Sequence, residues 1–151
     1  MINKIQISVK RLNHGKGLSL PELKTDFSAG VDLSAAIVDQ AIMKPRERKI
    51  IPTGLAIALP IGYEAQIRPR SGLAINHGIT VLNSPGTIDS DYRGEIGVIL
   101  INLGDKNFTI KRSMRIAQMV VSPVVKISWK EINILPKTNR GTGGFGSTGE
   151  N

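Results

Sequence analysis

Residues 95–103 read EIGVILINL, an almost unbroken apolar run that gives the first indication of the fold. A short run of this kind is typical of a strand that is buried on both faces. On either side of it, shorter β-rich runs end at glycine or proline, which is typical of strands joined by turns. We expect strands at 2–9, 49–59 (a strand pair pivoting near Pro52 and Gly54), 63–68, 78–82, 95–103, 108–111, 115–125 and 126–134.

The pattern within these runs indicates the fold class. Residues 2–9 and 63–68 alternate apolar and polar side chains, as half-buried strands do. Only residues 71–77 have the character of a helix, about two turns long. The 16 glycines and 8 prolines are spread along the chain, mostly between the expected strands, where turns are needed. Many short strands with one short helix predict an all-β fold, a distorted jelly-roll β-barrel.

The chain is expected to form a single domain, residues 1–151, because this length suits one hydrophobic core. In this interpretation residues 1–135 are the β-barrel core and residues 136–151 are a flexible tail. Within the tail, residues 140–149 read RGTGGFGSTG, which has too little apolar surface to fold alone. A plain linker would share this composition, but it would not need the arginine, phenylalanine and hydroxyl side chains.

The composition excludes several kinds of chemistry. The sequence has no cysteine, which rules out disulfides, thiolate zinc sites and thiol catalysis. His14 and His77 lack the spacing of paired metal ligands, so we interpret both as surface or packing residues. The first ten residues lack the apolar core of a secretory signal, and no apolar run is long enough to span a bilayer. We therefore expect a cytoplasmic protein with no membrane partner.

The net charge of +8 favours polyanionic partners. Nucleic acid and a nucleoside triphosphate are both candidates, and lysine and arginine could also simply be abundant. The three Phe, two Tyr and one Trp do not interleave with a basic patch, which weakens the case for stacking on single strands. Charge alone does not separate these three possibilities.

Five segments combine turn residues with polar functional groups. In chain order they read AGVDL at 29–33, RPRSGLA at 68–74, GTIDSDYRG at 86–94, RIAQ at 115–118 and RGTGGFGSTG at 140–149. Their order and separations resemble the five motifs of trimeric dUTPases, from about Ala29 to Gly149. Each motif alone is weakly specific, whereas all five in order are highly specific. The resemblance implies hydrolysis of dUTP to dUMP and pyrophosphate, which limits uracil incorporation into DNA and supplies dUMP for thymidylate synthesis.

The segment Arg70-Ser71-Gly72 brings a charged donor, a hydroxyl and a glycine to the expected start of the helix. Main-chain N–H groups at a helix start bind phosphate, and a glycine lets the ligand approach closely. An ordinary helix cap with solvated arginines would fit the same residues. By the resemblance, these three residues hold the phosphate chain of the substrate.

Residues 83–92 are expected to form a hairpin, because Asn83-Ser84-Pro85-Gly86 supplies turn chemistry. Asp89 and Asp91 lie on the same side of any extended segment, although a solvated turn would also explain them. By the resemblance, Asp89 is the catalytic base that deprotonates a water for in-line attack at the α-phosphorus. Tyr92 then packs against deoxyribose and excludes a 2′-hydroxyl, although a core tyrosine is the alternative for this residue alone.

The same hairpin is expected to recognise the base. The Asn83 amide offers a donor and an acceptor that can match the uracil edge and reject cytosine. Polar matching of this type discriminates by about 10⁴–10⁵ when the wrong base leaves buried groups unpaired. By the resemblance, Thr87, Ile88 and the main chain of Gly97 add contacts to the substrate.

The resemblance also implies a Mg²⁺ cofactor. Asp32, which would otherwise be a turn aspartate, helps to orient waters on the metal. Mg²⁺ usually keeps several waters and binds few protein carboxylates, so a sparse ligand set is expected. Gln118 is a second catalytic residue in this interpretation, in contact with the α-phosphate region near the attacking water.

The resemblance further implies a homotrimer with three shared active sites, in which the tail comes from a different subunit than the other motifs. Arg140 pairs with the γ-phosphate, and Phe145 covers the uracil ring. Ser147 and Thr148 add hydroxyl or backbone contacts, together with Gly146. The expected partner is dUTP, and no nucleic acid is required.

One position departs from the family pattern. Gly-Asp or Gly-Glu often precedes the arginine of the fourth motif, whereas Ser113-Met114 precedes Arg115 here. This difference puts the local loop geometry and subunit contacts in question.

Two other functions compete with the dUTPase interpretation. One is a dCTP deaminase-like enzyme of the same superfamily, and the other is a non-catalytic interaction protein on the same fold. The pattern from Asp89 to Tyr92 and the glycine-rich tail favour the dUTPase.

Overall fold

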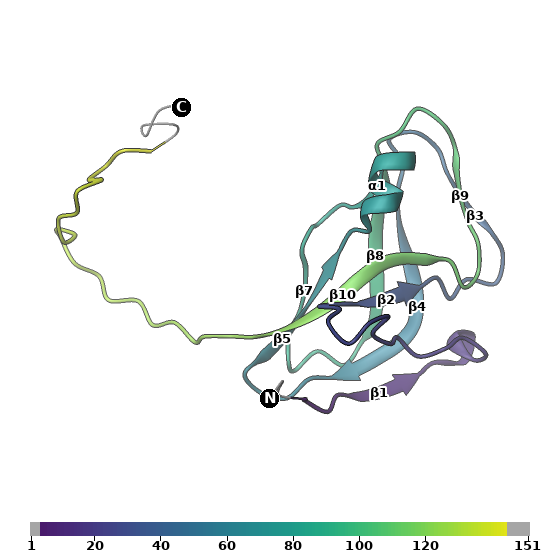
Figure 1. Ribbon diagram of the computed structural model, residues 1–151, viewed down its shortest axis with the longest axis horizontal. Helices are drawn as coiled ribbons and strands as arrows, with labels where there is room; N and C mark the ends of the chain where they lie inside the picture. Colours follow the sequence, from purple (N-terminus) through teal and green to yellow (C-terminus); the bar gives the residue numbers. More distant parts are fainter. Residues whose placement is uncertain (1–3, 145–151) are drawn as a thin grey trace.

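The computed structural model describes residues 4–144, and within them most of the regular secondary structure is β-strand (Figure 1). One α-helix and one short 3-10 helix interrupt the strands. In chain order the elements are β1 (Ser8–Arg11), η1 (Asn13–Gly15), β2 (Val31–Ser34), β3 (Ala41–Met43), β4 (Arg48–Ala58), β5 (Tyr63–Arg68), α1 (Ser71–His77), β6 (Ile79–Val81), β7 (Gly86–Ile88), β8 (Glu95–Asn102), β9 (Phe108–Ile110) and β10 (Arg115–Pro123).

Two four-stranded antiparallel sheets carry the fold. The strand order is β1-β4-β8-β6 in the first sheet and β2-β10-β5-β7 in the second, and β3 pairs with β9 separately. The sheets enclose one core but do not close into a continuous barrel, which is the distortion in this jelly-roll arrangement. The prediction of an all-β fold with a single short α-helix at 71–77 is confirmed.

The strand at 95–103 is central, but it is buried on one face rather than two. In β8 the buried positions alternate, with Ile96, Val98 and Leu100 in the core. Ile99 and Ile101 point to the other face and are only partly covered. The expectation of burial on both faces was therefore wrong, because an antiparallel sheet can pack on one side only.

The strand pair expected at 49–59 is one continuous strand with a bulge. The register between β4 and β8 shifts between Pro52 and Ala56. Gly54 sits in this bulge with φ +69, a conformation that suits glycine, and its Cα packs closely against Gly15 of η1. The pivot predicted near Pro52 and Gly54 is thus a bend within β4.

Two strand predictions at the ends of the chain were wrong. The first strand runs over Ser8–Arg11 and pairs with β4, whereas residues 4–7 of the expected 2–9 strand have no strand partner. Residues 126–134 form no strand and are exposed. Apolar alternation alone does not make a strand, since its main-chain groups also need a neighbouring strand to bond.

The hairpin expected at 83–92 was also wrong. β7 pairs with β5 in the second sheet, whereas β6, which precedes it, pairs with β8 in the first. The turn after β6 therefore carries the chain from one sheet to the other. Strands β2 and β3 were not predicted, and Asp32 lies in β2 rather than in a turn.

Candidate functional site

Most of the predicted site residues line two separate pockets. The first opens between the two sheets, at β5, β7 and β8, and we call it the inter-sheet pocket. The second lies beside the start of α1 and the middle of β10, and we call it the arginine pocket. Their described linings have no residue in common.

The inter-sheet pocket has an apolar back and a polar rim. Its volume is about 260 Å³, and the side chains of Ile67, Ile88 and Ile96 form the buried wall. A pocket of mixed character with a few placed polar groups is typical of a small-molecule site. The predicted residues that line it are Asn83, Thr87, Ile88, Asp89, Tyr92 and Gly97.

The rim of the inter-sheet pocket is shaped by a tight turn over residues 89–92. The Tyr92 N–H donates to the Asp89 carbonyl at 3.2 Å. Arg93 Nη1 donates to the carbonyls of Ser90 and Tyr92, both at 2.8 Å. This segment is therefore a turn, and the idea that Asp89 and Asp91 share one side of an extended strand was wrong. Asp89 is exposed at the pocket, where its carboxylate can accept a proton from water.

The arginine pocket is wider and strongly polar, with a volume of about 520 Å³. Three cationic side chains line it, those of Lys24, Arg68 and Arg70, against the single carboxylate of Asp32. Ser71 and Gly72 complete one wall at the start of α1, where main-chain N–H groups have no partner within the helix. This lining suits an anion with several oxygen atoms.

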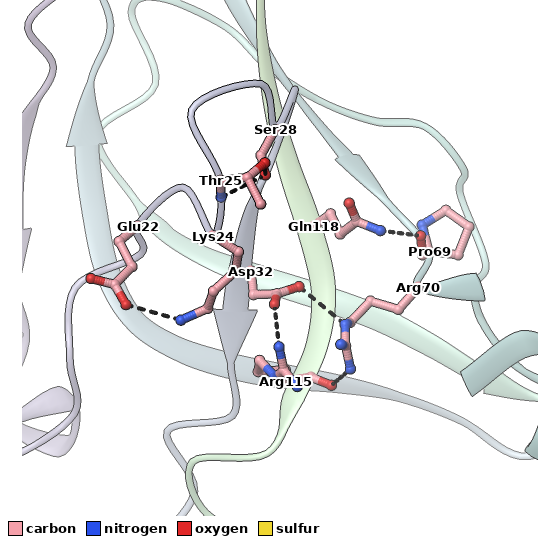
Figure 2. A network of polar contacts seen from close by, with 9 residues as sticks. All are labelled: Glu22, Lys24, Thr25, Ser28, Asp32, Pro69, Arg70, Arg115 and Gln118. Atoms are coloured by element: carbon pink, nitrogen blue, oxygen red, sulfur yellow. Dashed lines mark hydrogen bonds and ion pairs between the residues drawn. The ribbon is translucent and has the colours of Figure 1, made fainter. Parts of the chain in front are cut away.

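Asp32 holds two arginines in this region (Figure 2). Arg70 Nε donates to Asp32 Oδ1 at 3.0 Å, and Arg115 Nη1 donates to Oδ2 at 2.9 Å. Arg70 Nη1 also donates to the Arg115 carbonyl at 3.1 Å. The side chain of Asp32 is only 16% exposed, so these bonds fix the Arg70 guanidinium in a partly desolvated setting. A fixed guanidinium retains further donors for an anionic ligand.

Two further contacts shape the arginine pocket (Figure 2). The Gln118 amide lies close to the Pro69 carbonyl, with a long hydrogen bond of 3.4 Å. Lys24 donates to Glu22 at 2.9 Å, and this hydrogen bond lowers the pKa of the Glu22 carboxyl. Both side chains of the Lys24–Glu22 pair are well exposed, so a stronger anion can compete for the lysine.

The described residues offer little for a metal ion held by protein alone. Within residues 4–144, no group of three or more His, Asp or Glu side chains is arranged to bind a metal. Asp32 is the carboxylate in the arginine pocket, and both of its oxygens already accept bonds from arginine. This donor set fits an ion that arrives with phosphate oxygens and keeps its waters, as Mg²⁺ does.

The structure groups the predicted residues in a way that the sequence did not reveal. Arg70, Ser71, Gly72, Gln118 and Asp32 share the arginine pocket, whereas Asp89 lies in the inter-sheet pocket. Arg140 lines neither pocket, and its Nε donates to the Gly143 carbonyl at 2.8 Å. The predicted contacts of Phe145, Gly146, Ser147 and Thr148 lie outside the described residues.

Sequence reasoning missed several lining residues. Arg68 stood beside Arg70 in the second segment and could have been included on charge alone, but no pattern marked Lys24. Glu95 lines the inter-sheet pocket and lies 2.7 Å from His14. The His14 side chain is 35% exposed, so it lies at the surface as predicted, but the sequence did not reveal its contact with Glu95. His77 does pack, with its ring 5.0 Å from that of Phe108.

The departure in the fourth segment lies in a turn that is hydrogen-bonded to Ala35. Ser113 has φ +64, in the left-handed region where glycine is favoured. Its N–H donates to the Ala35 carbonyl at 2.9 Å, and the Met114 carbonyl accepts from the Ala35 N–H at 2.8 Å. The loop therefore adopts a glycine-like turn at Ser113, and Met114 packs against the core.

The two-sheet fold, with one arginine-lined pocket and one partly apolar pocket, defines a class of β proteins that bind small molecules. The comparisons with known proteins narrow this class. The family model described as dUTPase matches residues 16–149. A deoxyuridine 5'-triphosphate nucleotidohydrolase from Rickettsia akari is 59% identical over 98% of this chain and 99% of its own length. The chain belongs to the dUTPase family, and its activity is the hydrolysis of dUTP to dUMP and pyrophosphate.

Solved structures support the same assignment. The dUTPase of Staphylococcus bacteriophage 80alpha, in complex with dUPNHPP, superimposes with a TM-score of 0.86 and 25% identity, covering 97% of this chain and 99% of that one. A mutant dUTPase from phage phi11 of S. aureus has the same fold, with a TM-score of 0.78 and 20% identity, covering 88% of this chain and 100% of that one.

Among the described residues of our chain, no helix has the length and apolar character to cross a membrane.

Proposed function

We propose that the chain hydrolyses dUTP by attack of a water molecule at the α-phosphorus, with Asp89 as the general base. The observation that carries this proposal is the turn 89–92, which presents a carboxylate and a tyrosine together at the rim of the inter-sheet pocket. An aspartate at this rim accepts the proton of the attacking water. The products are dUMP, which feeds thymidylate synthesis, and pyrophosphate. Removal of dUTP limits uracil incorporation into DNA.

The inter-sheet pocket binds the nucleoside in this proposal. Asn83 and the main chain of Thr87, Ile88 and Gly97 read the polar edge of uracil, while the isoleucine wall contacts its ring. Cytosine is rejected because its donor and acceptor groups are reversed, which leaves pocket groups unpaired. Tyr92 packs against the deoxyribose where a ribose would carry its 2′-hydroxyl.

The arginine pocket binds the triphosphate. Arg70 is fixed by Asp32 and donates to phosphate oxygens, while Ser71 and Gly72 supply a hydroxyl, main-chain donors and room for close approach. Gln118 lies in the same pocket and contacts the α-phosphate region near the attacking water. Fixed donors around the phosphates stabilise charge that develops in the transition state.

Mg²⁺ is the proposed cofactor. When bound, it neutralises charge on the phosphate oxygens and helps to align them for in-line attack. Asp32 would reach the ion through water, since both carboxylate oxygens also accept from arginines. In the phage phi11 dUTPase, a structural Mg(II) ion is coordinated.

The two pockets support an active site shared between copies of the chain. Ile67 and Arg68 are successive residues of β5, so their side chains point to opposite faces of the sheet. Ile67 lines the inter-sheet pocket and Arg68 lines the arginine pocket. In this proposal, a nucleotide bound in the inter-sheet pocket of one copy meets the arginine pocket of another copy. We assign a homotrimer with three such sites.

The chain after β10 also supports this assembly. Residues 124–135 run away from the sheets as an exposed arm (Figure 1), and its apolar side chains include Val125 at 84% and Trp129 at 91% exposure. Large exposed apolar groups mark contact surfaces. An apolar groove of about 370 Å³ beside β1, lined by Ile7, Val9 and Leu23, offers a matching surface on a neighbouring copy.

The single Trp gives a direct test of the assembly. In a trimer whose arms are covered, Trp129 emits as a buried indole, and light scattering gives three times the mass of one chain. A monomer mass with the emission of a solvated tryptophan would contradict the proposal.

The tail completes the site in this proposal. We assign residues 1–151 to one domain with a β core over 1–135 and a tail over 136–151 that closes on the bound nucleotide. Arg140 then pairs with the γ-phosphate, Phe145 covers the uracil ring, and Gly146, Ser147 and Thr148 add contacts. A cytoplasmic location is part of the proposal, and a chain without cysteine is compatible with that reducing compartment.

The experiment that tests this function measures pyrophosphate release from dUTP, dCTP, dTTP and UTP in parallel, with Mg²⁺ and with EDTA. We expect release from dUTP only, suppressed by EDTA. Equal release from UTP would contradict the role of Tyr92, and release that persists in EDTA would contradict the metal. Absence of release from dUTP would overturn the proposed chemistry, and ammonia release from dCTP would then identify a deaminase.

A further inference from the structure

The position of the Tyr92 ring is fixed from two directions. Its hydroxyl donates to the Glu95 carbonyl at 2.9 Å. The ring also lies directly on Gly94, where an added Cβ would come within 2.6 Å of the Tyr92 Cζ atom. The orientation of Tyr92 at the pocket therefore depends on where the main chain of Gly94 and Glu95 is held.

The side chain of Glu95 anchors this main chain. Its Oε1 accepts the Gly54 N–H at 2.7 Å and lies 2.7 Å from His14 Nε2. The side chains of His14 and Glu95 are 35% and 27% exposed, so the contact is partly shielded from water. One carboxylate oxygen thus joins η1, the bulge of β4 and the start of β8.

The 3-10 helix η1 is itself seated firmly against the bulge. The Leu12 N–H donates to the Gly54 carbonyl at 2.8 Å. Gly15 and Gly54 face each other so closely that a Cβ on Gly15 would lie 2.6 Å from the Gly54 oxygen. The close main-chain contact between η1 and Gly54 therefore holds His14 beside Glu95.

We propose that His14 and Glu95 are positioning residues for sugar discrimination. His14 holds the Glu95 carboxylate, Glu95 holds the start of β8, and the Glu95 carbonyl holds the Tyr92 hydroxyl against the face where a 2′-hydroxyl would lie. The inference rests on the proposed packing of Tyr92 against deoxyribose. It assigns a role to a histidine outside the five segments, at a sequence separation of 81 residues from Glu95.

The test compares His14→Ala with His14→Gln, which can still donate a hydrogen bond to Glu95. Two ratios are measured in the full-length protein, kcat/KM for dUTP over UTP and the affinity for dUMP over UMP by calorimetry. Loss of one hydrogen bond should lower both ratios about tenfold in His14→Ala, with recovery in His14→Gln. His77→Ala is the matched control, because His77 packs on Phe108 and lines neither pocket, and its ratios should stay at the wild-type level.

A double-variant cycle shows whether His14 acts through Tyr92. Tyr92→Phe removes the hydroxyl that Glu95 holds, so adding His14→Ala to it should lower the ratios no further. Equal losses for the deoxy and ribo nucleotides, with unchanged ratios, would reduce His14 to a structural role and overturn the inference. Wild-type protein that hydrolyses dUTP and UTP equally would overturn both the inference and the proposed sugar contact. If both ratios in His14→Ala stayed at the wild-type level, the inference alone would be overturned.

Discussion

The inter-sheet pocket and the arginine pocket differ in the interactions that define them. The first is defined by shape, with an isoleucine wall, a hydrogen-bonded turn and main-chain groups at its rim. The second is defined by charge, with arginines held in place by one carboxylate. In the proposed function, the first pocket selects the base and the sugar, and the second binds the polyphosphate. Specificity and binding strength are therefore separable in this chain, and variants in one pocket should leave the other intact.

Asp89→Asn should have the largest effect. The change removes the proton acceptor and keeps the side-chain shape, so we expect kcat to fall by about 10²–10⁴-fold. Affinity for a non-hydrolysable dUTP analogue should be nearly unchanged. Pyrophosphate release and calorimetry measure the two quantities, and Asp91→Asn, two residues further along the same turn, is the control. Turnover near that of the wild type would remove Asp89 from the role of base.

Arg70→Ala should show most clearly that the two pockets bind independently, because it should change pyrophosphate affinity and not deoxyuridine affinity. Hydrogen bonds to charged groups contribute about 1.5–3 kcal/mol, so pyrophosphate binding should weaken by about 10- to 100-fold. Deoxyuridine contacts the other pocket, and its affinity should not change. Arg70→Lys should recover only part of the pyrophosphate affinity, because lysine lacks the planar fork that bonds Asp32 and phosphate together. A parallel loss of deoxyuridine affinity would show that the pockets are not independent.

Gly72→Ala tests the same pocket without touching its charge. A Cβ on Gly72 would meet nothing within 4 Å, so the protein should fold normally. Alanine in a helix is favoured over glycine by about 0.5–1 kcal/mol, and the melting temperature should hold or rise slightly. The KM for dUTP should nevertheless increase several-fold if phosphate approaches this residue closely. An unchanged KM would move the phosphate chain away from the start of α1.

Ser113→Gly should have the smallest effect, on stability alone. Serine at φ +64 is strained, and relief of the strain outweighs the greater entropy of glycine in the unfolded chain. The free energy of unfolding in urea should rise by about 0.5–1 kcal/mol. Ser122→Gly in β10, where no such strain is present, should destabilise instead. A loss of stability in Ser113→Gly would contradict the account of the fourth-segment departure.

The sequence predicted the local elements of the fold better than the way in which the site residues are grouped. Residues 63–68 folded as predicted, because their alternation matches the one buried face of β5. The helix at 71–77 was also predicted, although Leu73 is its only buried residue. The five segments singled out Asp89 and Arg70 as candidates, but linear order does not show that these residues lie in different pockets. That separation depends on β7 pairing with β5 rather than with β6, a long-range choice that no local pattern encodes.

Other misses have the same origin in long-range contacts. The bond between His14 and Glu95 joins residues 81 positions apart and needs the bulge at Gly54 to bring them together. Residues 126–134 have the composition of a strand, but strand formation also requires a neighbouring strand, and these residues pair with none in the described chain. In a trimer, such an edge can come from another copy.

The most direct test of the account mixes two inactive variants. Asp89→Asn damages the inter-sheet pocket and Arg70→Ala damages the arginine pocket, and the two chains are refolded together in equal amounts. If each site takes one pocket from each of two copies, random mixing restores about a quarter of the wild-type dUTP hydrolysis. If each chain forms a site by itself, every site retains one defect and the mixture shows no more activity than the average of the two variants. Recovery of activity is the predicted result, and its absence would contradict the shared site.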